Sequence, residues 1–278
     1  MTTLEFTLVV ALMALAAGYL GALTGLGGGV VVTPVLVILL RVDMRYAIGA
    51  TLVSVIATSS GAASAYVREG FSNVRIGMFL EVATTFGAIA GAGLATRIPT
   101  AVLSVVFGLV LLYSAWLSSR SQPEHLAVGE STGFTKHLRL NGSYPSPSGD
   151  RFYAVRHVPS GFGVMFGAGL ISGLLGIGSG ALKVLAMDQI MRIPFKVSTA
   201  TSNFMIGVTA AASAGIYWSR GYIDPGLAMP VMLGVLTGSM LGARRLAGAK
   251  VRVLRVIFAV VVGSLALEMI YSGVMGRL

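Results

Sequence analysis

Gly25-Leu26-Gly27-Gly28-Gly29 is the stretch that decides how this chain is organised, and a second copy stands at Gly176-Ile177-Gly178-Ser179-Gly180. Both copies lie inside long apolar runs. Glycine loses more backbone freedom on folding than any other residue and weakens a helix by about 0.5–1 kcal/mol relative to alanine. Four glycines in five positions of the first copy, and three in five of the second, therefore predict that each helix is interrupted. We expect the two interruptions to face each other and to form a binding site.

The composition is that of a membrane protein. Of 278 residues, 55% are hydrophobic and 11% are charged, against about 25% charged in soluble domains. Several runs reach the roughly 18–20 apolar residues that cross a bilayer. The net charge of +10 lies in short loops, as the positive-inside rule expects, so we expect lipid and no nucleic acid as partner. The fold class predicted is an all-α polytopic membrane protein, with irregular backbone only where protein buries it or it lines a cavity.

The apolar runs divide the chain into two sets of helices. Residues 1–22 lack a basic leader and carry Glu5, so we interpret them as a retained first span. A stretch rich in Pro, Gly, Ser and Asn separates the sets and predicts a polar linker. The predicted domains are an N-terminal transmembrane repeat (1–118), a cytoplasmic linker (119–157) and a C-terminal transmembrane repeat (158–278). The predicted helices are 5–23, 30–40, 47–67, 75–96, 100–118, 159–175, 181–191, 197–218, 226–247 and 251–274.

The two sets align without a gap at an offset of 151 residues. Identical residues at this offset include glycines, but also threonine, tyrosine and phenylalanine, which are harder to match by chance. Internal duplication of this kind is typical of secondary transporters. Matched pairs include Gly18 and Gly169, Thr58 and Thr209, Tyr66 and Tyr217, Gly87 and Gly238, and Phe107 and Phe258.

Loop charge predicts that the repeats are inverted. If each half crosses the membrane an odd number of times, one side holds fourteen Lys and Arg residues and the other five. An even number of crossings would give no bias. The positive-inside rule therefore favours inverted repeats with a cytoplasmic linker and external termini. The basic side comprises loops 68–75, 119–157, 192–196 and 244–255.

Lys183 is a cation inside an apolar segment, three residues after Gly180, and its equivalent in the first half is Val32. A charge at the bilayer centre costs at least about 2.5–3.5 kcal/mol, so it should face a partner or a cavity. We expect Lys183 to bind an anion. The alternatives are a side chain that reaches the interface or pairs with Glu81. Glu81 lies about two turns inside its own span and is the candidate for a coupling proton. Asp188 lies nearer a segment end, which predicts an interfacial position.

Neutral donors surround these charges in the sequence. Helices that restart after each glycine cluster would direct backbone N–H groups at an anion, although the glycines could instead only allow close helix packing. Hydroxyls and an amide of the third segment of each half are further candidates. For Thr58 and Thr209 we prefer hydrogen bonding between helices. The candidate ligands are Gly27, Gly28, Gly29, Gly178, Ser179, Gly180, Thr51, Ser54, Thr201, Ser202 and Asn203.

Motifs of enzymes and cofactor sites are missing from the sequence. The first glycine cluster lacks the last glycine of a dinucleotide-binding loop, and the second lacks phosphate-loop spacing. The chain has no cysteine, and its three histidines lack metal-site spacing. We therefore predict no catalytic residues, no metal and no cofactor.

Together these features resemble the TauE/SafE family of sulfite and organosulfonate exporters. The resemblance rests on residues 18–29 followed by Thr33-Pro34, on residues 169–180, on Ala200-Thr201-Ser202-Asn203 and on the duplicated halves. It covers nearly the whole chain except residues 119–157. Two departures stand in the second half: Ser179 replaces the middle glycine, and Leu185 stands where the first half has Pro34.

What the resemblance implies is transport of small sulfur-containing or carboxylate anions. The hypothesis is a secondary transporter in the bacterial cytoplasmic membrane that exports sulfite, sulfoacetate or thiosulfate by alternating access, coupled to a proton or sodium. An anion channel and a transporter of small carboxylates are the alternatives on the same scaffold. A homodimer is an open alternative to a monomer.

Overall fold

Long helices make up most of the chain in the computed structural model, which describes residues 3–24, 29–68, 70–119, 140–145, 149–246 and 251–276. The bounds agree with the predicted segments to within a few residues. The helices of the first half are α1 (Thr3–Thr24), α2 (Gly29–Leu40), α3 (Met44–Arg68), α4 (Val74–Ala95) and α5 (Thr100–Ser119). Those of the second half are α7 (Val158–Leu175), α8 (Gly180–Leu185), α9 (Phe195–Ser219), α10 (Pro225–Leu246) and α11 (Val251–Val274).

Three of the described helices are long and apolar enough to cross a membrane: Val74–Ala95, Val158–Leu175 and Pro225–Gly242. Shorter apolar segments lie in α1, α2, α5 and α11. One predicted segment, 181–191, is in fact composite. It begins as α8 and continues as a π-helical turn, η1 (Ala186–Ile190). Such turns insert an extra residue into a helix and are frequent at functional sites.

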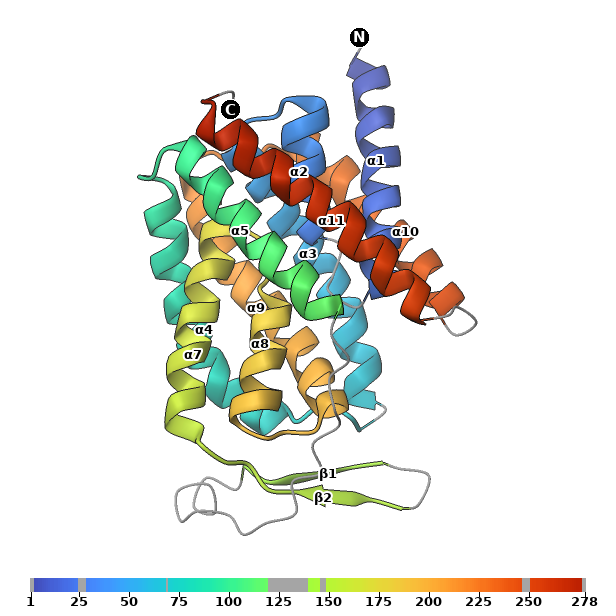
Figure 1. Ribbon diagram of the computed structural model, residues 1–278, viewed down its shortest axis with the longest axis vertical. Helices are drawn as coiled ribbons and strands as arrows, with labels where there is room; N and C mark the ends of the chain where they lie inside the picture. The colour runs from blue at the N-terminus through green and yellow to red at the C-terminus, as the bar shows by residue number, and fades with distance from the viewer. Residues whose placement is uncertain are drawn as a thin grey trace.

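The two halves are interlaced (Figure 1). The first helix of each half packs on the fourth helix of the other half, so that α1 lies beside α10 and α7 lies beside α4. The equivalent helices α3 and α9 pack together, as do α5 and α11. The core is therefore formed between the halves as much as within them.

Glycines bring the helices of these pairs into backbone contact. A β-carbon at Gly87 would overlap the carbonyl of Phe166, and a β-carbon at Gly238 would overlap the carbonyl of Leu15. The two contacts are equivalent at an offset of 151 residues, because Gly87 corresponds to Gly238 and Phe166 corresponds to Leu15. The same holds for Gly169 against Thr84 and for Gly18 against Val235. Small residues at helix interfaces allow this close approach in membranes, and here both halves use them in the same way.

The connecting loops gather in two groups. In the first, Nη2 of Arg45 donates to the carbonyl of Ile98 (3.0 Å), and its guanidinium lies over the ring of Tyr222. These contacts join the first turn of α3 to the α4–α5 and α9–α10 connections. In the second group, Nδ2 of Asn73 donates to the carbonyl of Leu140, and the Arg156 amide donates to the carbonyl of Met191.

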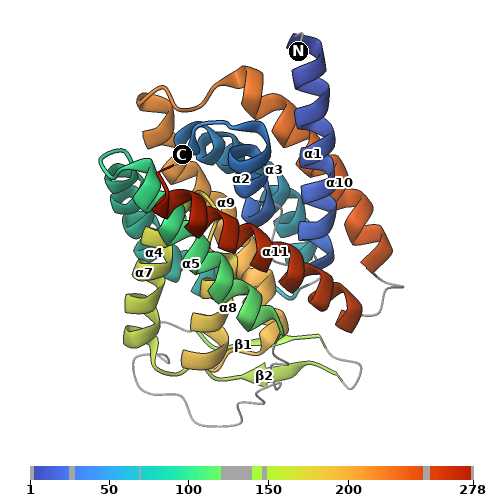
Figure 2. The same cartoon turned by 45° about the horizontal axis from the view of Figure 1, so that its top comes forward.

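A β-hairpin departs from the all-α prediction. Strands β1 (Gly142–Tyr144) and β2 (Arg151–Tyr153) pair antiparallel, with Ser143 opposite Phe152. It lies at the end of the molecule opposite the two termini (Figures 1 and 2). The predicted linker is thus partly ordered, and its residues 120–139 lie outside the described chain. The domain boundaries themselves stay a prediction.

The segment is rich in polar residues, but it also contains apolar side chains, and the burial of these side chains explains why the hairpin forms. Four of its side chains are buried against the ends of the helices, in one cluster with Ile76, Leu80, Met187 and Met191. Burial of apolar area offsets the chain entropy that was expected to keep the segment open. The four buried side chains are Leu140, Tyr144, Tyr153 and Val155.

Candidate functional site

The second glycine cluster interrupts the helix, as predicted. Helix α7 ends at Leu175, and Gly176 accepts a left-handed conformation (φ 68°) while its amide bonds the carbonyl of Ser172. Gly178 is also left-handed (φ 71°), and so is Ser179 (φ 43°). Only glycine adopts this region without steric cost. The cluster therefore permits a turn that other residues would resist, and helix α8 restarts at Gly180.

The first cluster lies partly outside the described residues, because 25–28 are not described. Helix α1 ends at Thr24 and α2 begins at Gly29. The start of α2 is close to the second break, since a β-carbon built at Gly29 would lie 3.8 Å from the carbonyl oxygen of Gly176.

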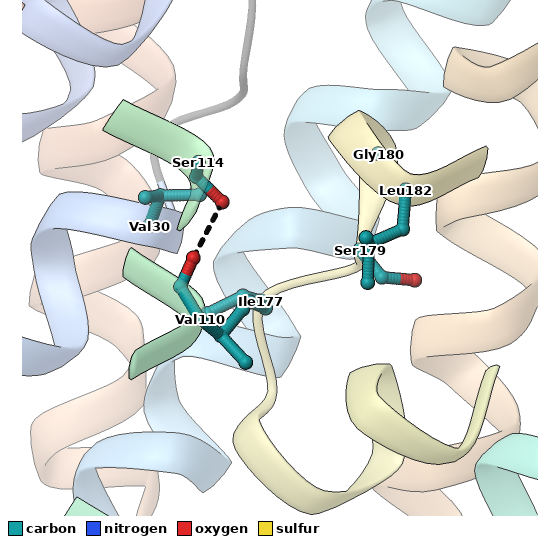
Figure 3. Close-up of a pocket in the computed structure, with 7 residues that line it drawn as sticks. All are labelled: Val30, Val110, Ser114, Ile177, Ser179, Gly180 and Leu182. Carbon is teal, nitrogen blue, oxygen red and sulfur yellow. Dashed lines mark hydrogen bonds between the residues drawn. The ribbon is translucent and has the colours of Figure 1, made fainter. Parts of the chain in front are cut away.

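A small pocket lies between the second break and the first half (Figure 3). On one side the Ser114 hydroxyl donates to the carbonyl of Val110 (2.8 Å). Across the pocket the Ser179 hydroxyl is buried, and no partner for it lies among the described residues. A buried group left unpaired costs about 1–3 kcal/mol. The Ser179 hydroxyl is thus available to a ligand oxygen. The lining residues are Val30, Val110, Ser114, Ile177, Ser179, Gly180 and Leu182.

Lys183, on α8, is fully buried, with 0% of its surface exposed. Its ammonium donates to the hydroxyl of Thr209 on α9 at 2.5 Å. The hydroxyl in turn lies 2.6 Å from Oε1 of Glu81 on α4, to which it donates. Lys183 therefore does not reach the surface, and the alternative of a link to Glu81 is what the structure contains. We call Lys183, Thr209 and Glu81 the buried triad.

The carboxylate of Glu81 is buried asymmetrically. Only 7% of the residue is exposed. Its Oε1 accepts hydrogen bonds from Thr209 and from Thr85 (3.2 Å), whereas Oε2 has no partner among the described residues. One carboxylate oxygen is satisfied by two hydroxyls and the other is open, so the group can hold either a negative charge or a proton.

The remaining predicted ligands divide into two groups. Ser202 donates to the carbonyl of Gly180 (3.3 Å), which brings it to the second break. A β-carbon at Gly29 would lie 3.0 Å from Cγ2 of Thr51, so Thr51 stands beside the start of α2. Its hydroxyl bonds Thr33, and the Ser54 hydroxyl donates to the Thr51 carbonyl.

Two predicted ligands make other contacts. The Thr201 hydroxyl accepts from the amide of Asn73 in the α3–α4 connection, and the Asn203 amide donates to its own helix at Thr199. Asp188 lies in the π-helical turn, where only 2% of it is exposed, and its interfacial position stays a prediction. Gly27 and Gly28 lie outside the described residues. The ligand roles of all these residues stay predictions.

Thr209 was not among the predicted ligands. It was expected to form a hydrogen bond between helices, and it does so, but its partners are the two charged side chains. Its role could have been inferred from the sequence only through the rule that a buried ammonium and a buried carboxylate need a polar group within reach. Sequence spacing alone did not single it out, because several hydroxyls of α9 share that property.

Comparisons with known proteins find relatives along nearly the whole chain. The family described as "Sulfite exporter TauE/SafE" matches residues 10–269. The probable membrane transporter protein YunE of Bacillus subtilis is 25% identical over 276 residues, covering 96% of this chain and 98% of its own. YdhB of the same organism is 27% identical, with 85% and 87% covered. A probable membrane transporter of Xylella fastidiosa is 26% identical, with 91% of each chain covered. No solved structure matches.

Proposed function

The chain belongs to the TauE/SafE family of sulfite exporters, and from that premise we propose that it is a secondary transporter of a small sulfur-containing oxyanion. Sulfite, sulfoacetate and thiosulfate are the proposed substrates, and export across the bacterial cytoplasmic membrane is the proposed direction. The membrane setting agrees with the apolar helices and with relatives that are named probable membrane transporters.

The observation that carries the proposal is the fully buried ammonium of Lys183, on the helix that restarts after the second break. This ammonium has three N–H donors, of which Thr209 takes one among the described residues, so the others are available to an anion. An anion near the break would also meet the unpaired hydroxyl of Ser179. Backbone N–H groups of both glycine clusters and the neutral side chains of Thr51, Ser54, Thr201, Ser202 and Asn203 complete the proposed set of donors.

We infer that the halves are inverted and work by alternating access. Loop contacts support this inference. Asn73, in the α3–α4 connection, donates to the carbonyl of Leu140, which precedes the hairpin. The residue equivalent to Asn73 at an offset of 151 is Asp224. It lies in the α9–α10 connection, which also holds Tyr222 against Arg45. Equivalent loops thus belong to different groups. Inverted repeats of this kind rock against each other around a central site.

A thermal-shift panel tests the proposal. Purified protein is heated with sulfite, thiosulfate, sulfoacetate, sulfate or acetate, and a bound anion raises the melting temperature by mass action, stabilising the fold by about 2.7 kcal/mol at one hundred times its Kd. Lys183→Ala should abolish the shift, while Lys196→Ala, an exposed lysine on α9, should leave it unchanged. A panel without any shift, or a shift that survives Lys183→Ala, would contradict the proposal.

Transport itself is measured in proteoliposomes. Uphill accumulation of the best ligand under an imposed proton or sodium gradient is expected of a secondary transporter. Flux that only runs down the anion's own gradient would instead indicate a channel.

A further inference from the structure

We propose that the buried triad couples anion binding to the uptake of one proton, with the anion and Glu81 alternating as the counter-ion of Lys183. This inference rests on the proposed function, because it requires the anion to bind beside Lys183. It adds the identity of the coupling ion, the group that carries it and the residue that links the two.

The link is a single hydroxyl. Thr209 accepts from the ammonium of Lys183, and its one proton has two acceptors in reach: Oε1 of Glu81 at 2.6 Å and the carbonyl of Met205 at 2.9 Å. An ionised Glu81 attracts this proton and completes a chain from ammonium to carboxylate. A protonated Glu81 is a weaker acceptor, since charge-assisted hydrogen bonds are about twice as strong as neutral ones. The hydroxyl then turns to Met205.

Charge balance makes the proton and the anion move together. When Glu81 is ionised, its carboxylate neutralises the ammonium of Lys183. Protonation of Glu81 leaves Lys183 as an uncompensated buried cation, which is strongly unfavourable in a membrane interior. A singly charged anion at Lys183 restores neutrality. A doubly charged anion such as thiosulfate leaves one excess negative charge, which favours a proton on Glu81 still more strongly. Conversely, an anion that enters while Glu81 is ionised leaves an excess negative charge, which a proton on the open Oε2 removes.

Few other charges act on Glu81. Helix α7, which packs along α4, carries no titratable side chain. On α9 the titratable groups lie eight and thirteen residues from Thr209, roughly 12 and 20 Å along the helix. On η1 the acid lies about one and a half turns beyond Lys183. Lys183 therefore dominates the field at Glu81. The other groups on neighbouring elements are Arg75 on α4 itself, Asp188 on η1, Lys196 and Tyr217 on α9, and Tyr153 on the hairpin.

The number of protons follows from the repeat. Positions equivalent to Glu81 and Lys183 in the other half are Met232 and Val32. Neither residue titrates, so the equivalent location holds no second proton-carrying group. One proton accompanies one anion in each transport cycle. Export in this mode runs down the anion's own gradient, because an inward proton gradient favours movement of both species into the cell.

The experiment measures thiosulfate binding calorimetrically between about pH 5 and about pH 9, where the charge of thiosulfate does not change. In the wild-type protein the Kd should rise by up to about tenfold per pH unit once Glu81 is ionised. Where Glu81 is ionised in the unbound protein, heats in buffers of different ionisation enthalpy should report uptake of close to one proton per anion. Glu81→Gln should bind tightly at all these pH values and take up no proton.

Variants of Thr209 supply a second measurement. Thr209→Val should reduce the pH dependence, and Thr209→Ser, which keeps the hydroxyl, should restore it. If the melting curve shows that Glu81→Gln does not fold, the two Thr209 variants test the coupling in its place. Thiosulfate binding that is independent of pH in the wild-type protein overturns the coupling and leaves the proposed function standing. Absence of binding for every anion of the thermal-shift panel, at any pH, overturns the proposed function itself.

Discussion

The two halves share the same arrangement of helices but carry different side chains at equivalent positions. In the buried triad, Lys183 and Glu81 are joined through Thr209. At an offset of 151 residues the equivalent positions are Val32, Met232 and Thr58. Val32 is buried, and the hydroxyl of Thr58 bonds its own helix at Ser54 and Val55. The same location is therefore ionic in one half and apolar in the other.

This contrast separates scaffold from chemistry. The glycine contacts that hold α1 on α10 and α4 on α7 occur in both halves at equivalent positions. The charges occur once. The packing of the repeat has thus been kept twice, whereas the proposed binding and coupling groups are concentrated around the second break.

The largest expected effect comes from making the ionic location apolar. Lys183→Met or Glu81→Met alone should destabilise the protein by about 3–5 kcal/mol, because each leaves an unpaired buried charge. The double variant should recover most of this loss, because replacing a buried ion pair with apolar residues is often neutral or stabilising. Unfolding of the three variants in detergent forms a double-mutant cycle. Additive losses would show that the two charges do not depend on each other.

A smaller effect tests whether the scaffold is equivalent in both halves. Gly87→Ala and Gly238→Ala should each destabilise by about 1–3 kcal/mol, because the added methyl group meets a backbone carbonyl of the facing helix. Gly93→Ala, in α4 but facing open space, is the matched control and should be neutral or slightly stabilising. Melting temperatures measure all three. Unequal losses at Gly87 and Gly238 would break the equivalence.

Ser179→Gly restores the glycine that the first half has at position 28. We expect a gain of about 1 kcal/mol, because glycine takes the left-handed conformation without strain. Anion binding should weaken at the same time, since the unpaired hydroxyl is lost. Melting temperature without ligand and thiosulfate affinity are the two measurements. A variant that is more stable and binds equally well would exclude Ser179 as a ligand.

The smallest effect concerns the two caps of the fourth helices. Asn73 caps α4 through Ile76 and donates to the Tyr153 hydroxyl of the hairpin (2.7 Å), whereas its equivalent, Asp224, is exposed. Tyr153→Phe should cost about 0.5–1.5 kcal/mol near neutral pH. At the start of α10, Oδ1 of Asp224 accepts from the Gly226 amide (2.8 Å), so Asp224→Ala removes this cap and should cost about as much.

Tyr153 also predicts that the protein becomes less stable as the pH rises in the alkaline range. Burial raises the pKa of its phenol from 10.0 to about 12. Above about pH 10 the phenol ionises in the unfolded chain but not in the folded protein, so its contribution is complete below that pH and is lost as the pH rises toward 12. Tyr153→Phe should flatten this decline. An unchanged alkaline profile would mean that other groups cause it.

Sequence patterns predicted the helices well because long apolar runs leave few alternatives in a membrane. The second break was predictable because glycine clusters disfavour helix at known cost. The hairpin was not, since Leu140, Tyr144, Tyr153 and Val155 are scattered through a polar segment and become apolar surface only when folded. The role of Thr209 was not predictable either, because it depends on how α9 is rotated between α4 and α8.

The interlacing of the halves constrains how the protein is made. Helix α1 packs on α10, but roughly 200 residues separate the end of the one from the start of the other. At a synthesis rate of about 5–20 residues per second, α1 waits roughly 10–40 s in the bilayer before its partner emerges from the ribosome. During that interval its small-residue face is open to other nascent segments, so a pause or a chaperone that shields this face would govern the yield of correctly assembled protein.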